Sequence, residues 1–143
     1  MFDLTNHVAL ITGGNGGLGL AMAKGLAKSG AKIAIWGRNA DKNAQAVAEL
    51  QALGGEAVAF ACDVTDVQSS IDAFAQTIAH FGKIDSCFAN AGGSGVRGPF
   101  HKLSTEDWQQ STELNVSSVI DTFKLAILVE HDQTTKIFTN PSD

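Results

Sequence analysis

A cluster of glycines near the start of the chain has the composition of a phosphate-binding turn. The segment Thr12–Gly19 reads Thr-Gly-Gly-Asn-Gly-Gly-Leu-Gly and lies between the apolar run Val8–Ile11 and the helix-forming run Ala21–Leu26. Because glycine has no side chain, phosphate oxygens approach the N–H groups of such a turn closely, and a following helix N-terminus adds further donors. The order strand, glycine turn, helix predicts a dinucleotide site rather than only a flexible loop.

Two glycine registers fit this turn, and the sequence leaves both open. Gly14, Gly16 and Gly19 match G-x-G-x-x-G, whereas Gly13, Gly17 and Gly19 match G-x-x-x-G-x-G. In either register the whole turn is a candidate for contact with the cofactor. The candidate cofactor-binding residues here are Thr12, Gly13, Asn15, Gly16, Gly17, Leu18 and Gly19.

A basic residue follows the second apolar run of the chain. The expected strand Lys32–Trp36 leads into Gly-Arg-Asn, which ends at Asn39. Dinucleotide folds often carry an acid here that binds the adenosine ribose, but the planar fork of Arg38 suits a ribose 2′-phosphate instead. The alternative is a surface arginine that caps a turn. Asp41 is expected to start the next helix.

Polar residues also follow the third and fourth apolar runs. Asp63, in Cys62–Thr65, is placed to accept a hydrogen bond from an adenine amino group, but the spacing equally fits a helix cap made by Asp63 or Thr65. Asn90, Ala91 and Gly92 follow the next run, at the strand end where open α/β sheets bind ligands, although Asn and Gly are also common in turns.

Asn115 lies in the middle of an expected helix, where asparagine is unfavourable. Periodicity alone favours a partly buried amide whose hydrogen bonds are satisfied, with a functional role as the alternative. The four histidines, His7, His80, His101 and His131, show no ligand or triad spacing.

Alternating strands and helices are expected to position these residues. The strands are expected at Val8–Thr12, Lys32–Trp36, Glu56–Ala61 and Ile84–Ala89, and the helices at Gly17–Ser29, about Asp41–Leu53, Val67–Phe81 and from the capping box Ser104–Asp107 onward. Successive β-α-β units predict an α/β fold, a doubly wound parallel sheet with helices on both faces that is incomplete at its C-terminal side.

The apolar spacing of the later helices predicts which side chains face the sheet. The inward sets are expected to be Ala44, Val47, Leu50 and Leu53; Val67, Ile71, Phe74, Ile78 and Phe81; and Trp108, Leu114, Val119, Phe123 and Ile127.

The composition limits the classes of function. The chain has 143 residues, 44% of them apolar and 17% charged, with a net charge of −5, which argues against a nucleic-acid surface. No apolar run has membrane-spanning length, and the N-terminus has no signal-peptide pattern. Cys62 and Cys87 lie in apolar runs without histidine neighbours, so we expect reduced thiols, no metal site and a cytoplasmic protein.

Four motifs together resemble the short-chain dehydrogenase/reductase family. They are Thr12-Gly-x-x-x-Gly17-x-Gly19, Asp63-Val64, Asn90-Ala-Gly92 and Asn115-Val116, in the family's order and spacing, and the resemblance covers about Asn6 to Leu128. It implies a Rossmann fold that binds NAD or NADP, with NADP favoured by Arg38. It further implies that Asp63 and Val64 flank the adenine, that Asn90, Ala91 and Gly92 lie beside the cofactor, and that Asn115 supports a water-mediated proton relay.

The chain departs from the family where catalysis is concerned. Family enzymes use a later serine and a Tyr-x-x-x-Lys motif, in which tyrosine exchanges the proton while nicotinamide exchanges hydride, but this sequence contains no tyrosine. Ser142 stands in Asn-Pro-Ser and is not assigned the serine's role. We expect a partial dinucleotide-binding domain over residues 1–129 and a divergent polar tail over 130–143, with Lys136–Thr139 as a short fifth strand. The tail has the character of a premature end.

These observations favour the nucleotide-binding half of an oxidoreductase that transfers hydride between nicotinamide and a carbonyl or hydroxyl carbon. The alternatives are a non-catalytic nucleotide-binding or subunit-interaction module and a non-functional truncation product. A small carbonyl or alcohol substrate is implied, with a sugar alcohol and a 3-oxoacyl group both open. A homo-oligomer is expected, because the fourth strand would lie near an exposed sheet edge and the last helix would be partly uncovered.

Overall fold

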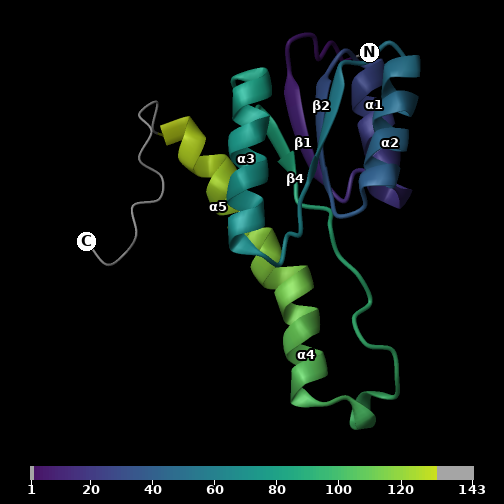
Figure 1. The fold of residues 1–143 in the computed structure, drawn as a ribbon, viewed down its shortest axis with the longest axis vertical. Helices are drawn as coiled ribbons and strands as arrows, with labels where there is room; N and C mark the ends of the chain where they lie inside the picture. The colour runs from purple at the N-terminus through teal and green to yellow at the C-terminus, as the bar shows by residue number, and fades with distance from the viewer. Residues whose placement is uncertain (1, 132–143) are drawn as a thin grey trace.

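Strands and helices alternate along the chain in the computed structural model, which describes residues 2–131 (Figure 1). The expected strand at Lys136–Thr139 and Ser142 lie outside the described residues. The strands are β1 (Val8–Thr12), β2 (Lys32–Gly37), β3 (Ala57–Ala61) and β4 (Ser86–Phe88). The helices are α1 (Gly17–Lys28), α2 (Ala40–Ala52), α3 (Val67–Phe81), the 3₁₀ turn η1 (Phe100–Lys102), α4 (Thr105–Thr112), the π-helical segment η2 (Glu113–Ser117) and α5 (Ser118–His131).

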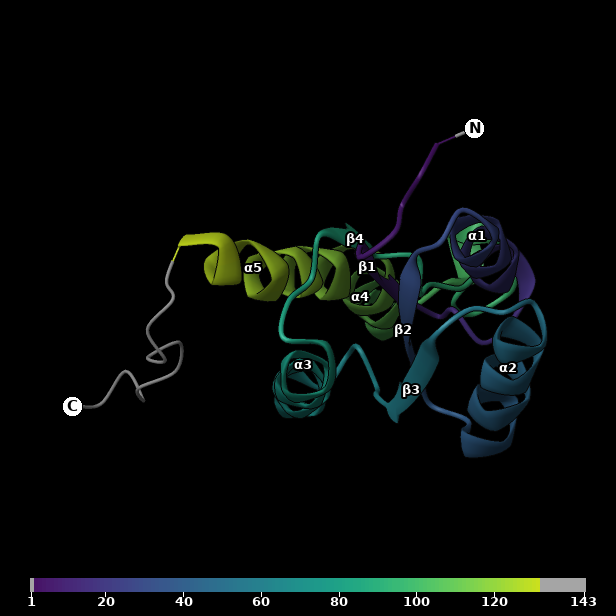
Figure 2. The ribbon, with the colours of Figure 1, turned by 90° about the horizontal axis from the view of Figure 1, so that it is seen from above.

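The four strands form one parallel sheet in the order β3-β2-β1-β4. Val8 pairs with Lys32, Ala9 with Ser86, and Ile33 with Ala57. Helices α1 and α2 cover one face of the sheet, while α3 and α5 lie on the other (Figure 2). This arrangement confirms the expected doubly wound α/β class, and β4 is an edge strand of the sheet as expected.

The centre of the sheet is apolar on both faces. Every residue of β1 is buried, which is why this strand reads as a continuous apolar run rather than an alternating one. Trp36 on β2 is fully buried, packs edge-on against Phe74 of α3, and donates its indole N–H to Thr77 Oγ1 at 2.9 Å. Its polar atom is therefore satisfied inside the core, as a buried indole requires.

The helices begin at caps that differ in part from those expected. Asn39 caps α2 by accepting from the Lys42 N–H, so Asp41 does not start the helix but lies in its first turn. Asp66 caps α3, so neither Asp63 nor Thr65 makes the helix cap that the sequence left open as the alternative to an adenine contact. An acceptor must stand immediately before the first turn to reach its unpaired N–H groups, and only Asn39 and Asp66 do so here. The capping box at Ser104 and Asp107 is confirmed.

The inward face of α2 is rotated slightly from the expected one, whereas the inward face of α3 is confirmed except at its first residue. In α2, Ala44 and Leu53 are exposed, whereas Asn43 is buried beside Leu50. In α3, Val67 is 52% exposed, while the rest of the expected stripe packs on the sheet. The apolar pattern misses Asn43 because a buried amide contributes nothing to hydrophobic periodicity.

The expected long helix is divided into α4, η2 and α5, and its expected inward face was largely wrong. Trp108, Phe123 and Ile127 are 62%, 40% and 55% exposed. Ser118, Thr122 and Leu125 are buried instead, on the helix that packs against α3. The two hydroxyls donate to carbonyls one turn back, Ser118 Oγ to Leu114 O at 2.6 Å and Thr122 Oγ1 to Ser118 O at 2.8 Å. Because they are satisfied within the helix, they are buried without an unpaired polar atom.

The two cysteines are free thiols, as expected. Burial raises the pKa of Cys87 to about 11 and also raises the pKa of Cys62. Both are therefore protonated near neutral pH. Over residues 2–131, no helix combines the length and apolar character needed to cross a bilayer.

Candidate functional site

A cleft of about 460 Å³ lies where β1, β2, β3 and β4 end. In Figure 1 these strand ends are at the lower side of the sheet. These are the carboxyl ends of parallel strands, where open α/β sheets bind ligands. Predicted site residues lining the cleft are Gly13, Asn15, Gly16, Leu18, Arg38, Asn39, Asp63, Val64, Asn90, Ala91 and Gly92. Thr12, Gly17, Gly19 and Asn115 were also predicted but are not among its lining residues.

The backbone of the glycine turn distinguishes the two registers. Gly13 and Gly17 have φ of 65° and 50°, in the left-handed region that side chains other than glycine rarely adopt. Gly16 is extended, with φ of −176°, so its conformation requires no glycine. These angles favour the G-x-x-x-G-x-G register of Gly13, Gly17 and Gly19.

The start of α1 has the features of an anion site. Gly16 is its N-cap and provides no side-chain hydrogen bond, whereas α2, α3 and α4 within the described chain are capped by side chains. No acidic residue lies in the first turn of α1. A Cβ on Gly17 would meet no atom within 4 Å, so the space in front of this turn is open. Open space, unpaired N–H donors and the positive end of the helix dipole fit a pyrophosphate.

Gly19, Asn90 and Thr12 hold the turn in place. A Cβ on Gly19 would lie 2.6 Å from Asn90 Nδ2 and would also collide with the Gly13 carbonyl. Asn90 Nδ2 donates to Thr12 O at 3.1 Å, and Ala91 N donates to Thr12 Oγ1 at 2.9 Å. Gly19 therefore permits close packing of α1, and Thr12 and Asn90 connect the ends of β1 and β4.

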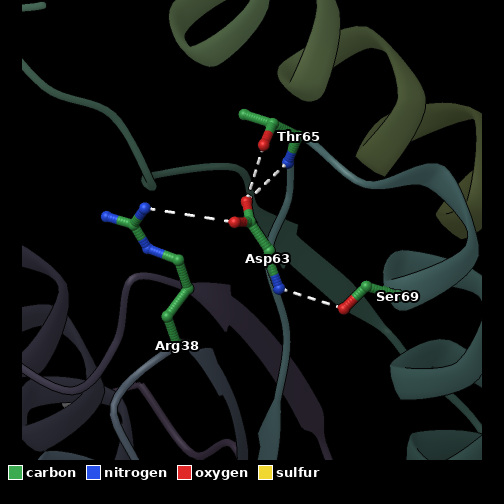
Figure 3. A network of polar contacts seen from close by, with 4 residues as sticks. All are labelled: Arg38, Asp63, Thr65 and Ser69. Atoms are coloured by element: carbon green, nitrogen blue, oxygen red, sulfur yellow. Dashed lines mark hydrogen bonds and ion pairs between the residues drawn. The ribbon is translucent and has the colours of Figure 1, made fainter.

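Asp63 and Arg38 meet at the cleft, as Figure 3 shows. Asp63 Oδ1 accepts from Thr65 Oγ1 at 2.8 Å and from Thr65 N at 3.0 Å, and Asp63 N donates to Ser69 Oγ at 3.0 Å. The Thr65 hydroxyl is the largest cause that lowers the pKa of Asp63, with smaller contributions from the Thr65 N–H and Arg38. The carboxylate is therefore ionised at neutral pH.

Arg38 remains accessible to a ligand. Its Nη1 lies 4.0 Å from Asp63 Oδ2, and the two side chains are 73% and 42% exposed. An ion pair this long and this exposed stabilises the fold by at most about 1 kcal/mol. Arg38 is thus held loosely at the cleft and caps no turn among the described hydrogen bonds.

Several residues of the cleft were missed in the sequence. Lys42 lines it from the first turn of α2, four residues after Arg38. Asn43 is buried and accepts a hydrogen bond from Asn15. No sequence signal distinguished Asn43 from a solvent-facing polar residue. The other missed lining residues are Trp36, Gly37, Cys62 and Leu114.

The side-chain amide of Asn115 makes hydrogen bonds through both its nitrogen and its oxygen, as expected. The residue is exposed, however, and not partly buried as the sequence predicted. It lies in the π-helical segment η2, donates to Gly93 O and Ser111 O, both at 2.9 Å, and accepts from Gly93 N at 3.0 Å. A Cβ on Gly92 would lie 2.8 Å from Asn115 Oδ1. Asn115 therefore fastens the loop after β4 to the helix, and π-helical turns often occur at functional sites.

Comparisons with known proteins agree with this fold. Residues 7–137 match the short chain dehydrogenase family. Gluconate 5-dehydrogenase of Gluconobacter oxydans (strain 621H) is 38% identical over 119 residues, which are 83% of this chain and 46% of that protein. The structure of an NAD⁺-bound xylitol dehydrogenase superposes with a TM-score of 0.82 at 32% identity, over 86% of this chain and 47% of that one.

A short-chain dehydrogenase of Burkholderia cenocepacia J2315, solved in complex with NADP, has a TM-score of 0.81 at 33% identity, over 87% of this chain and 51% of that one. The chain belongs to the short-chain dehydrogenase family. It spans about half the length of the curated relatives it matches.

The glycine turn generates the first prediction. In Gly17→Val, a branched side chain would occupy the open space before α1 and disfavour the left-handed backbone. We expect calorimetry to show NADPH affinity at least about tenfold lower, with a smaller effect on folding. Gly25→Val is the matched control, because a Cβ there also meets open space, but on the body of α1. Parental affinity in Gly17→Val would show that this register is wrong.

Proposed function

We propose that this chain binds NADP in the cleft and forms the cofactor-binding half of a short-chain dehydrogenase. The observation that carries the proposal is the convergence on one cleft of a glycine turn, an uncapped helix start and an accessible arginine. Phosphate groups match each of these features. When bound, the cofactor accepts or donates hydride at its nicotinamide ring.

Each part of the dinucleotide has a candidate partner in the chain. The turn Gly13–Gly17 and the start of α1 would hold the pyrophosphate. Asp63 and Val64 would flank the adenine, with Asp63 accepting from its amino group, and Asn90–Gly92 would lie toward the nicotinamide. The family resemblance motivates these assignments, and the lining of the cleft supports them. The dinucleotide-binding unit would extend over residues 1–129.

The cleft favours NADP over NAD because of its charges. Arg38 and Lys42 both line it, and the strand end before them carries no acid that would repel a 2′-phosphate. The pairing of Arg38 with Asp63 opposes phosphate binding only weakly, given its length of 4.0 Å. A planar guanidinium binds phosphate through two parallel charge-assisted hydrogen bonds, whereas a ribose hydroxyl offers it no negative charge.

The proposed reaction of the complete enzyme is hydride transfer between the nicotinamide and a carbonyl or hydroxyl carbon of a small molecule. Gluconate and xylitol, named for two of the relatives, are polyhydroxylated, which favours a sugar alcohol or sugar acid as the substrate. Asn115 would take the supporting role in proton transfer that the resemblance implies. Its amide contacts to Gly93 and Ser111 orient it beside the loop after β4.

Arg38→Leu tests the proposed preference. We expect NADPH to bind the parent chain more tightly than NADH, and we expect the substitution to weaken NADPH binding at least about tenfold with little effect on NADH. One charge-assisted phosphate contact is worth roughly 1.5–3 kcal/mol. Calorimetry measures both constants, and Arg97→Leu serves as the control, since Arg97 is exposed and does not line the cleft. Equal NADPH affinities of Arg38→Leu and the parent would remove Arg38 from the site.

Catalysis by the 143-residue chain is expected to be far below the family's level. Positioned proton transfer typically contributes about 10²–10⁴-fold, and the chain contains no tyrosine to perform the family's step. The measurement is NADP(H) turnover with a panel of ketones, sugars and secondary alcohols. Turnover that follows the protein through purification would contradict this expectation, and His101→Ala would then test another acid.

Self-association through η2 and α5 is proposed from their uncovered apolar side. Val116, Ile120, Phe123 and Ile127 follow one another at helical spacing and are 50%, 49%, 40% and 55% exposed. Fully burying such a side chain is worth roughly 1.5–3 kcal/mol, so we expect Phe123→Glu to raise the dissociation constant of a dimer at least about tenfold in sedimentation equilibrium. Phe2→Glu, at an 87% exposed site outside the helix, should leave it unchanged. A compact monomer at high concentration would disprove the assembly.

A further inference from the structure

Two asparagines connect the glycine turn to the end of β2 through a chain of side-chain hydrogen bonds. Asn43 on α2 is only 6% exposed, and its Nδ2 donates to Gly37 O at 2.8 Å. Its Oδ1 accepts from Asn15 Nδ2 at 2.6 Å. A Cβ on Gly37 would lie 2.5 Å from Asn43 Oδ1, so glycine at this position leaves room for the two amides to meet.

This chain of bonds permits only one orientation of each amide. A backbone carbonyl accepts and never donates, so the Gly37 carbonyl requires the NH₂ group of Asn43 to face it. The oxygen of Asn43 must then face Asn15, and it requires the NH₂ group of Asn15 in turn. A reversal of either amide would place two donors or two acceptors opposite each other. The buried Asn43 therefore fixes the amide of Asn15.

The fixed orientation leaves an acceptor at the cleft. Asn15 lines the cleft, and its Oδ1 has no hydrogen-bond partner among the described residues. None of the buried side-chain nitrogen and oxygen atoms in that part of the chain lacks a partner, so Asn15 Oδ1 is accessible from solvent. An oxygen with lone pairs and no proton accepts from a hydroxyl and repels a phosphate.

Resting on the proposed binding of NADP, we infer that Asn15 Oδ1 accepts a hydrogen bond from the adenosine ribose 3′-hydroxyl and that Asn43 is the positioning residue that aims it. Arg38 and Lys42 are the cationic groups of the cleft and suit the 2′-phosphate. The 3′-hydroxyl is the donor that remains on this ribose, and a neutral acceptor matches it. Asn43 acts through Asn15 and itself contacts no ligand.

The test compares adenosine 2′,5′-bisphosphate with its 3′-deoxy analogue by calorimetry on the full 143-residue chain. For the parent we expect the loss of the hydroxyl to weaken binding about 3- to 10-fold, the effect of one neutral hydrogen bond. In Asn15→Ala this ratio should fall to about one. In Asn43→Leu, which keeps Asn15 but frees its amide to turn, the ratio should also fall toward one. A merely structural role of Asn43 would lower both affinities and leave their ratio unchanged.

Two further variants serve as a control and as a replacement for a variant that does not fold. Gln51→Ala, at an exposed site on the same helix, should retain the parental ratio. Asn43→Ala also removes the amide that faces Asn15, without the bulk of leucine, and it decides the matter if Asn43→Leu does not fold. A ratio that survives in Asn15→Ala, or that stays at the parental value in a folded Asn43 variant, overturns the inference alone. Absence of binding of either compound to the folded parent overturns the proposed cofactor site as well.

Discussion

The close packing of the start of α1 on the end of β1 is the constraint on which the cleft depends. Gly19 allows it, because a Cβ there would collide with the Gly13 carbonyl and approach Asn90 Nδ2 to 2.6 Å. That approach directs the first N–H groups of α1 toward the open side of the sheet. Asn90 then stabilises the turn by donating to Thr12 O. A larger residue at Gly19 would displace the helix and remove the geometry that the phosphates need.

The polar residues of the cleft have different roles. Arg38 and Lys42 supply positive charge to it. Asp63 accepts its two hydrogen bonds from Thr65, whereas Arg38 lies farther from it, at 4.0 Å. Since the pKa of Asp63 is lowered mainly by the Thr65 hydroxyl, its ionisation does not depend on Arg38. Arg38 can therefore leave Asp63 for a phosphate without changing the charge of the carboxylate at neutral pH.

Much of this architecture could be predicted from the sequence. Continuous apolar runs such as Val8–Thr12 identified buried parallel strands, and the glycine turn and Asn90 identified the strand ends that form the cleft. Both signals are local, because a strand's composition and a turn's glycines reflect their own backbone. The roles of Lys42 and Asn43 could not be predicted, since each depends on the distance between α2 and the glycine turn, which only the folded chain sets.

The failure to predict the inward face of the last helix comes from the polar residues on that face. Ser118, Thr122 and Leu125 follow Leu114 at intervals of four, four and three residues, which is the spacing of one helix face. Ser118 and Thr122 carry hydroxyls, which hydrophobic periodicity does not count, so the apolar pattern selected Phe123 and Ile127 on another face.

The π-helical segment η2 carries Asn115, which binds both backbone groups of Gly93. One local departure from α-helical geometry thus lies where the helix fastens the loop beside the cleft. Asn115 also donates to Ser111 O, so the amide that holds the loop is itself held by the turn before it. The position of the loop therefore depends on one polar side chain, whereas the packing of the helix on α3 depends on the separate face of Ser118, Thr122 and Leu125.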